Sequence, residues 1–336
     1  MDVEIIKKRI EYYDFIRGIA IIMVVGIHTF TSYPIDTTIG CISAIIRQIL
    51  NCAVPIFLAL SGLFCGRKHL DNKQSRISFW KKQIPKVYIP ALIWSLPYFI
   101  QNVIEFNGGG GYSLVKQLVI LLICGCSIYY FIALIVQYYL LLPTLQKYKS
   151  VMMPVSIISS MLSITIITYL TKMQGIQIPL IVFAGPFTTW FVFFMLGAYY
   201  SSSKINYTVK QAIAVVIFGL ALECVETYWL NTNYGGGYGI KLSAFIYSIG
   251  VIMLILSPKV KAVYKSNKLT QIIAYIGNIS FGVYLIHCFV IKGVNYLLPT
   301  HSWILSWSLA VILTSIVIIA ARKILPFGLN KYWGFS

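Results

Sequence analysis

Residues 17–28 read RGIAIIMVVGIH, so an arginine and a histidine stand at the two ends of an apolar run. A run of this kind is typical of a helix that crosses a membrane. Ionisable side chains inside a membrane cost free energy and are functional candidates by default. The stretch therefore predicts a membrane fold, and it makes Arg17 and His28 candidates for a site.

The composition of the whole chain agrees with a membrane protein. Hydrophobic residues make up 58% of the 336 residues and charged residues 11%, whereas soluble domains carry about 25% charged residues. A helix needs roughly 20 mostly apolar residues to cross the hydrocarbon layer. We identify ten candidate spans, at about 15–34, 41–65, 87–106, 127–145, 151–170, 180–200, 209–229, 240–257, 274–296 and 302–321.

These spans predict an all-α polytopic membrane protein with about ten transmembrane helices. We expect one membrane-embedded domain over residues 1–336, with no soluble domain appended. The apolar stretch 114–125 is too short to cross a bilayer and is expected to be interfacial or re-entrant.

The net charge of +18 would suggest nucleic-acid binding in a soluble protein, but here its distribution fits a membrane topology. If the spans alternate in direction, 21 of the 27 Lys and Arg residues lie on the side of the N-terminus, in segments 7–9, 67–86, 147–149, 204–210, 259–268 and 322–331. This asymmetry follows the positive-inside rule. It predicts an N-in/C-in topology in a lipid bilayer and no nucleic-acid partner.

The seven cysteines are scattered, and most of them fall within the spans. Their spacing matches no metal-binding pattern, and small apolar packing explains such residues. The sequence therefore predicts no metal site.

Helical geometry places Arg17 and His28 on one face of the first span. A helix turns about 100° and rises about 1.5 Å per residue, so the two residues lie roughly 16 Å apart along the axis. Asp14, three residues before Arg17, lies on the same face within ion-pair reach. A snorkelling arginine and a hydrogen-bonded interior histidine are the alternatives, but histidine also exchanges protons near neutral pH.

Further polar residues occur in other spans. Arg47 and Asn51 lie in the second span, Glu223 and Glu226 share a face of the seventh, and His287 lies in the ninth. A Glu–Arg pair between spans would offset the cost of desolvation. Alternatively, these groups line an aqueous pocket around His28.

Four motif-like stretches occur in order along the chain. They are YYDFIRGIAIIMVVGIH (12–28), VPIFLALSGLF (54–64), IYYFIALIVQYYLLLP (128–143) and GNISFGVYLIH (277–287). Together they resemble the motifs of the acyltransferase family 3 of integral-membrane O-acyltransferases, over essentially the whole chain. The resemblance implies a bacterial enzyme, multi-pass in the inner or plasma membrane. Such an enzyme esterifies a hydroxyl of a surface glycan or a lipid-linked saccharide, usually with acetyl from acetyl-CoA.

By this resemblance, Arg17 and His28 match the pair in the first span of the family. His28 would act as general base or as transient acyl acceptor. In such a mechanism, Asp14 would orient Arg17, and Glu223 or Arg47 would orient His28 or the sugar from the outer side. The remaining expected pocket residues are Arg47, Asn51, Tyr130, Glu226, Tyr284 and His287.

The family's Arg-x-x-Arg motif at the start of the third span is altered here. The matching stretch KKQIPKVYIP, residues 81–90, has Gln83 and Lys86 at the arginine positions. Lysine binds phosphate as a point charge but lacks the bidentate fork of arginine. We expect Lys82, Lys86 and Arg76 to contact acyl-CoA, with its phosphates against the basic segment 67–86.

Two other functions remain open from sequence. A proton-coupled secondary transporter or flippase would use Asp14, Arg17, His28 and Glu223 as a proton relay, although we find no internal repeat typical of transporters. A non-catalytic sensor or assembly subunit is the third possibility. The sequence leaves open the glycan acceptor and the choice between acetyl, succinyl and other acyl groups.

Overall fold

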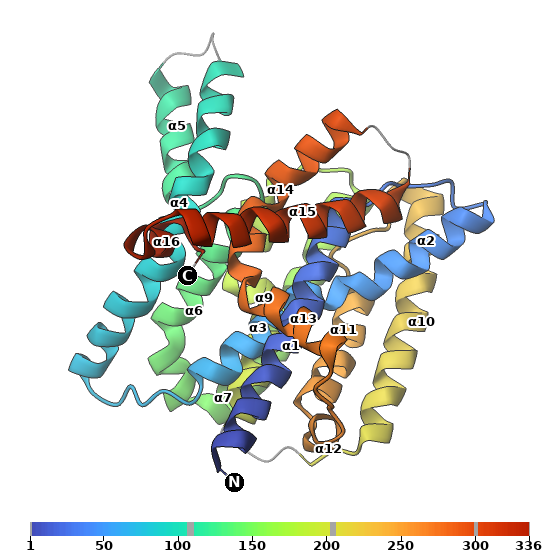
Figure 1. Ribbon diagram of the computed structural model, residues 1–336. Helices are drawn as coiled ribbons and strands as arrows, with labels where there is room; N and C mark the ends of the chain where they lie inside the picture. The colour runs from blue at the N-terminus through green and yellow to red at the C-terminus, as the bar shows by residue number, and fades with distance from the viewer. Residues whose placement is uncertain (1, 106–110, 202–205, 299–301, 336) are drawn as a thin grey trace.

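The computed structural model describes residues 2–105, 111–201, 206–298 and 302–335, and every regular element in these ranges is a helix (Figure 1). The α-helices are α1 (Asp2–His28), α2 (Thr38–Ile49), α3 (Ala53–Cys65), α4 (Lys73–Glu105), α5 (Gly111–Leu122), α6 (Tyr130–Lys147), α7 (Lys149–Thr168), α8 (Leu180–Ala184), α9 (Phe187–Tyr200), α10 (Val209–Tyr234), α11 (Leu242–Leu256), α12 (Pro258–Ala262), α13 (Lys268–Asn278), α14 (Ser280–Leu297), α15 (Trp303–Ile324) and α16 (Phe327–Trp333). Short 3-10 segments, η1 (Leu50–Cys52) and η2 (Ser127–Tyr129), precede α3 and α6, and a π-helical segment, η3 (Tyr169–Met173), extends α7. The predicted all-α fold is confirmed.

Seven helical segments in the described ranges are long and apolar enough to cross a membrane. They are Thr38–Cys65, Lys73–Glu105, Ser127–Lys147, Lys149–Met173, Val209–Tyr234, Ser280–Leu297 and Trp303–Ile324. Two shorter apolar helices, Phe187–Tyr200 and Leu242–Leu256, add to them. The chain is therefore a multi-pass membrane protein; the count of about ten and the N-in/C-in orientation remain predictions.

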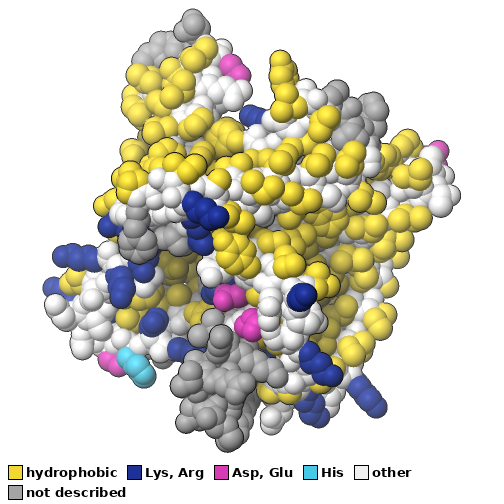
Figure 2. Space-filling model, in the orientation of Figure 1, with side chains coloured by type: hydrophobic (Ala, Val, Ile, Leu, Met, Phe, Trp, Pro, Cys, Tyr) yellow, Lys and Arg dark blue, Asp and Glu magenta, His cyan; other side chains and the backbone are white. Residues whose placement is uncertain are grey.

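The surface fits this assignment. Large apolar side chains are exposed along α15, among them Ile304, Ile312 and Ile316, and they form a continuous apolar band in Figure 2. The stretch 114–125, expected to be interfacial or re-entrant, forms α5, which packs beside the end of α4 in a projecting hairpin (Figure 1). Leu114, Leu118 and Leu122 of α5 are exposed, as lipid contact would require.

Three predicted spans have different limits in the structure. The first was expected to reach residue 34, but α1 ends at His28, where the Thr29 hydroxyl donates to Val25 O at 3.1 Å. The span 180–200 is broken at Pro186, which has extended backbone between α8 and α9, because proline offers no N–H to a helix. The span 274–296 is broken at Ile279, between α13 and α14. The first of these differences puts His28 at a helix end.

Helix α1 runs through the middle of the molecule (Figure 1) and joins two hydrophobic cores. Ile16 and Ala20 pack into the core that contains α9 and α11, whereas Ile21 and Val25 pack into the core that contains α14 and α15. On the second side, the Trp303 and Trp307 indoles donate to backbone carbonyls of α1 at 3.0 and 2.8 Å. These contacts fix the direction in which α1 presents Arg17 and His28.

Candidate active site

Two cavities meet at His28. The larger one, of about 640 Å³, lies at the end of the molecule where α1 ends, and we name it the distal cavity. The smaller one, of about 150 Å³, extends along α1 to Arg17, and we name it the proximal cavity. His28, Tyr130, Val24 and Val54 line both cavities. His28 lies deep in the bundle, yet its side chain is exposed to this space.

The predicted common face of Arg17 and His28 is confirmed, because both residues line the proximal cavity. The predicted ion pair is confirmed as well: Arg17 Nη1 lies 2.8 Å from Asp14 Oδ1. The Arg17 guanidinium also lies over the Phe64 ring, 4.9 Å from its centroid. Most other residues that line this cavity are apolar or aromatic, including Phe57, Phe131 and Tyr284. The cavity is thus a narrow apolar passage with a held cation at one end and a histidine at the other.

His287 lies directly behind His28, with the two ring centroids 5.1 Å apart. Its side chain is fully buried, and Nδ1 lies 2.8 Å from Tyr284 O and 3.0 Å from Val283 O. Carbonyl oxygens only accept hydrogen bonds, so Nδ1 carries the proton and Nε2 keeps its lone pair. The sequence predicted His287 as a pocket residue, but not that it would contact the catalytic candidate.

One group in the described part of the chain could hold a metal ion. The ligand atoms of His28, His287 and Cys288 all lie within 4.8 Å of one another. Cys288 Sγ lies 3.5 Å from His287 Nε2, so the thiol can also act as a weak donor to this nitrogen. The sequence predicted no metal site because the cysteine spacing matches no metal-binding pattern. That spacing could not show that two histidines and a cysteine come together here.

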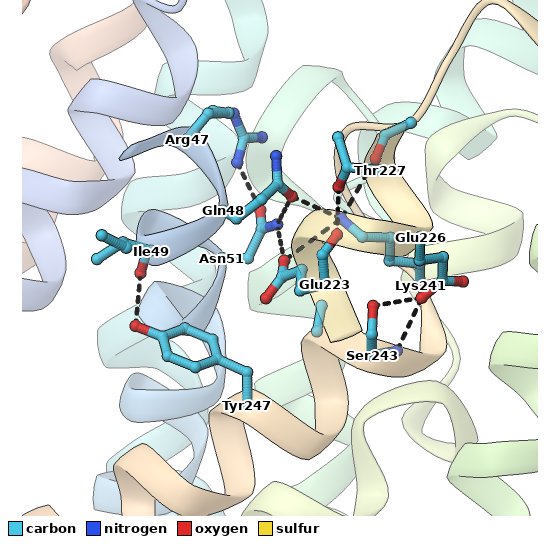
Figure 3. A network of polar contacts seen from close by, with 12 residues as sticks. Arg47, Gln48, Ile49, Asn51, Glu223, Glu226, Thr227, Lys241, Ser243 and Tyr247 are labelled. Atoms are coloured by element: carbon cyan, nitrogen blue, oxygen red, sulfur yellow. Dashed lines mark hydrogen bonds and ion pairs between the residues drawn. The ribbon is translucent and has the colours of Figure 1, made fainter. Parts of the chain in front are cut away.

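A buried polar network (Figure 3) borders the distal cavity, which two of its residues, Arg47 and Asn51, line. Arg47 Nη1 donates to Asn51 Oδ1, and Asn51 Nδ2 donates to Glu223 Oε1. Lys241 Nζ lies 3.4 Å from the same Glu223 oxygen and donates to Gln48 Oε1. Glu223 and Lys241 are 0% and 1% exposed, so the network ties α2 to α10 and to the start of α11 through an ion pair shielded from solvent.

This network settles where several predicted site residues lie. Glu223 makes its direct ion pair with Lys241, and it reaches Arg47 only through Asn51. Glu226 accepts a hydrogen bond from Ser243 N at 3.0 Å. Neither carboxylate is among the residues that line the two cavities at His28, whereas Arg47 and Asn51 line the distal cavity.

Sequence reasoning missed three residues of this region. Lys172, Tyr238 and Lys241 were not among the predicted site residues; Tyr238 belongs to the glycine-rich loop, residues 235–239, and Lys241 follows it closely. In the structure Lys172 and Tyr238 line the distal cavity and Lys241 lies in the buried network. Lys241 follows directly on GGGYGI and precedes an apolar run, and a lysine at that boundary was the only available signal.

The residues expected to bind the donor lie elsewhere. Lys82 and Lys86 are exposed on α4, and Arg76 Nε donates to Leu70 O at 2.8 Å. None of the three lines the proximal or the distal cavity. A third cavity, of about 440 Å³, lies at the opposite end of the molecule from the distal cavity and is lined by Arg67, Lys68 and Lys149, among others.

Apolar helices around a deep histidine, reached from two cavities, define a membrane protein with an accessible space inside its helical bundle. The model of the acyltransferase family 3, described as an acyltransferase domain, matches residues 10–323, nearly the whole chain. The chain therefore belongs to the acyltransferase family 3 and is a membrane acyltransferase. The comparisons with curated proteins and with solved structures gave no match.

Proposed function

We propose that this acyltransferase moves an acetyl group from acetyl-CoA to a hydroxyl group of a cell-surface polysaccharide or its lipid-linked precursor. The observation that carries the proposal is the position of His28 between the proximal and distal cavities. A transfer reaction needs both reactants at one proton-exchanging group. Two cavities that share His28 meet this need, one for the donor and one for the acceptor.

The donor would enter from the cytoplasmic face of a bacterial inner membrane, with both termini of the chain on that side. Its phosphates would lie against the basic segment 67–86, with Arg67, Lys68 and Lys149 of the third cavity as further candidates. Lys82, Lys86 and Arg76, all in α4, remain candidates for the same role. The acetyl-bearing arm would extend along the mainly apolar proximal cavity, past Arg17.

In the proposed reaction, His28 removes the proton from the acceptor hydroxyl while its oxygen attacks the thioester carbonyl carbon. The new C–O bond forms and the C–S bond breaks, and the departing CoA sulfur takes the proton from His28. His287 Nε2 can accept a hydrogen bond from His28 and so orient its ring. Transient acetylation of His28 itself is the second route to the same product.

The test uses surface glycans from cells that carry the wild-type protein or the His28→Ala variant. We expect the wild-type glycan to carry additional acetyl mass, and the variant glycan to lack it. Purified protein in lipid nanodiscs with labelled acetyl-CoA and this glycan should show the same difference. Undiminished transfer by His28→Ala would overturn the assigned role.

The transporter alternative makes a different prediction. A proton-coupled transporter or flippase would depend on a proton gradient and would not consume acetyl-CoA. Membership of an acyltransferase family favours the enzyme. Glycan acetylation in nanodiscs, where no gradient exists, would separate the two functions.

A further inference from the structure

We infer that the distal cavity binds a negatively charged acceptor, and that Arg47 and Lys172 hold an oxyanion of it, a carboxylate or a phosphate. The identification of the bound ligand as the acyl acceptor rests on the proposed function. The charge of the cavity itself rests on the structure alone. Two cations and no carboxylate occur among the described residues that line it.

Arg47 is built into the wall of this cavity. The residue is 7% exposed, its Nη1 donates to Asn51 Oδ1, and the guanidinium lies over the Phe30 ring, 5.8 Å from its centroid. The described residues give the guanidinium this single hydrogen bond, so other N–H groups remain for a ligand. A positioned guanidinium binds carboxylate or phosphate oxygens through a planar pair of donors.

Lys172 supplies the second cation from η3, on a different side of the cavity. Its ammonium lies against the glycine-rich loop, since a Cβ atom placed on Gly236 would be 3.6 Å from Lys172 Nζ. Tyr238 and Gly239 of the same loop also line the cavity. The ion pairs in the described ranges are Arg17–Asp14 and Lys241–Glu223, so neither Lys172 nor Arg47 has a direct acidic partner there.

The nearby carboxylates do not neutralise these cations. Glu223 is bound to Lys241 and Asn51, and Glu226 is bound to Ser243. The distal cavity and the buried network beside it together hold three cationic side chains and two carboxylates. The cations are Arg47, Lys172 and Lys241, and the carboxylates are those of Glu223 and Glu226. Arg47 is buried without a direct acidic partner in the described ranges, which is costly for a charge, and an anionic group on a ligand would complete the balance.

The position of the two cations favours the acceptor over the donor as the source of the anion. Arg47 and Lys172 line only the distal cavity, whereas Arg17 lines the proximal one. The basic segment proposed for the CoA phosphates lies at the other end of α1. An anion bound by Arg47 and Lys172 therefore belongs to the molecule that enters from the distal side. A uronic acid would supply a carboxylate, and a lipid-linked sugar would supply a phosphate.

The experiment measures binding to purified protein in nanodiscs without acyl donor. The probes are a hyaluronan tetrasaccharide, the same tetrasaccharide with its carboxyl groups reduced to alcohols, and a farnesyl-diphosphate-linked N-acetylglucosamine. We expect one or both anionic probes to bind at least about tenfold more tightly than the reduced tetrasaccharide, the size of one charge-assisted hydrogen bond. Preference for the first identifies a carboxylate site, and preference for the third identifies a phosphate site.

The key variant is Lys172→Met, which keeps the length of the side chain and removes its charge. We expect it to weaken anionic-probe binding about tenfold, and Lys172→Arg to retain most of the binding. Lys116→Met, on the exposed face of α5, is the matched control and should bind as the wild type does. Equal affinity for charged and reduced probes, binding of no probe, or full binding by Lys172→Met would each overturn the inference. Acetyl transfer is scored separately, so a charged-ligand site without transfer would contradict only the proposed function.

Discussion

At the scale of single residues, the proposed role of His28 as a base depends on the tautomer of His287. Two backbone carbonyls hold the proton of His287 on Nδ1, which leaves Nε2 as an acceptor beside His28. A general base is effective when a third group orients it. In the proposed reaction, His287 is thus a positioning residue, and His28 is the group that meets the substrates.

Replacing His287 should therefore lower the rate more than it lowers binding. We expect His287→Phe to reduce kcat by about 10–100-fold, the usual effect of losing a partner that orients a reactive group. KM for acetyl-CoA should change little, because His287 does not line the proximal cavity. Steady-state kinetics on purified protein would measure both quantities.

Cys288→Ala is the matched control at the next position. If His28 works as a base, this variant should keep most of the activity, because the thiol is at most a weak donor to His287 Nε2. A loss as large as that of His287→Phe, together with inhibition by a chelator, would instead indicate a metal held by His28, His287 and Cys288.

These residues also show how far sequence reasoning reaches. The shared face of Asp14, Arg17 and His28 could be predicted, since it depends only on the repeat of one helix. The Lys241–Gln48 and Asn51–Glu223 contacts join positions 193 and 172 residues apart. Neither contact, nor the charge of the distal cavity, could be derived before the packing of α2, α10 and α11 was known.

At the scale of helices, the approach of α13 to α1 requires glycine. A Cβ atom on Gly277 would lie 1.8 Å from Asp14 O, and one on Gly18 would lie 1.9 Å from Ile273 O. These residues therefore allow direct backbone contact between the two helices, as small residues do in membrane bundles. The contact also fixes the part of α1 that carries Asp14 and Arg17.

Gly277→Ala should consequently destabilise the protein by about 1–3 kcal/mol, the cost of an overpacked contact. Thermal unfolding in detergent would measure the change. Gly293→Ala in α14 is the control, because no atom lies within 4 Å of a Cβ placed there and alanine favours a helix over glycine. Equal stability of the two variants would contradict the proposed role of the α1–α13 contact.

The same scale explains the errors in the predicted spans. Hydropathy detects apolar length but not where a helix breaks, so 180–200 and 274–296 were each predicted as one helix. Proline at position 186 is a visible break signal. At Ile279 the break follows Gly277 and Asn278, two residues that weaken a helix, and it gives α14 a separate start, from which His287 reaches His28.

At the scale of the whole molecule, the proposed reaction requires that the two ends of the bundle face different compartments. The third cavity, with Arg67 and Lys68, lies at one end, and the distal cavity, with Lys172 beside Gly236, lies at the other. Acetyl-CoA is a cytoplasmic metabolite in the proposed scheme, and the surface glycan is external. The N-in/C-in topology predicted from the distribution of basic residues would place the third cavity on the cytoplasmic side and the distal cavity on the external side.

Labelling of single cysteines tests the topology directly. In a variant whose seven native cysteines are replaced, we expect Gly236→Cys to react with a membrane-impermeant maleimide added to intact spheroplasts. Lys68→Cys should react only after the membrane is permeabilised, because segment 67–86 is predicted to be cytoplasmic. The reverse pattern would place the basic cavity outside, where no acetyl-CoA is present. It would therefore overturn the donor route while leaving membership of the acyltransferase family intact.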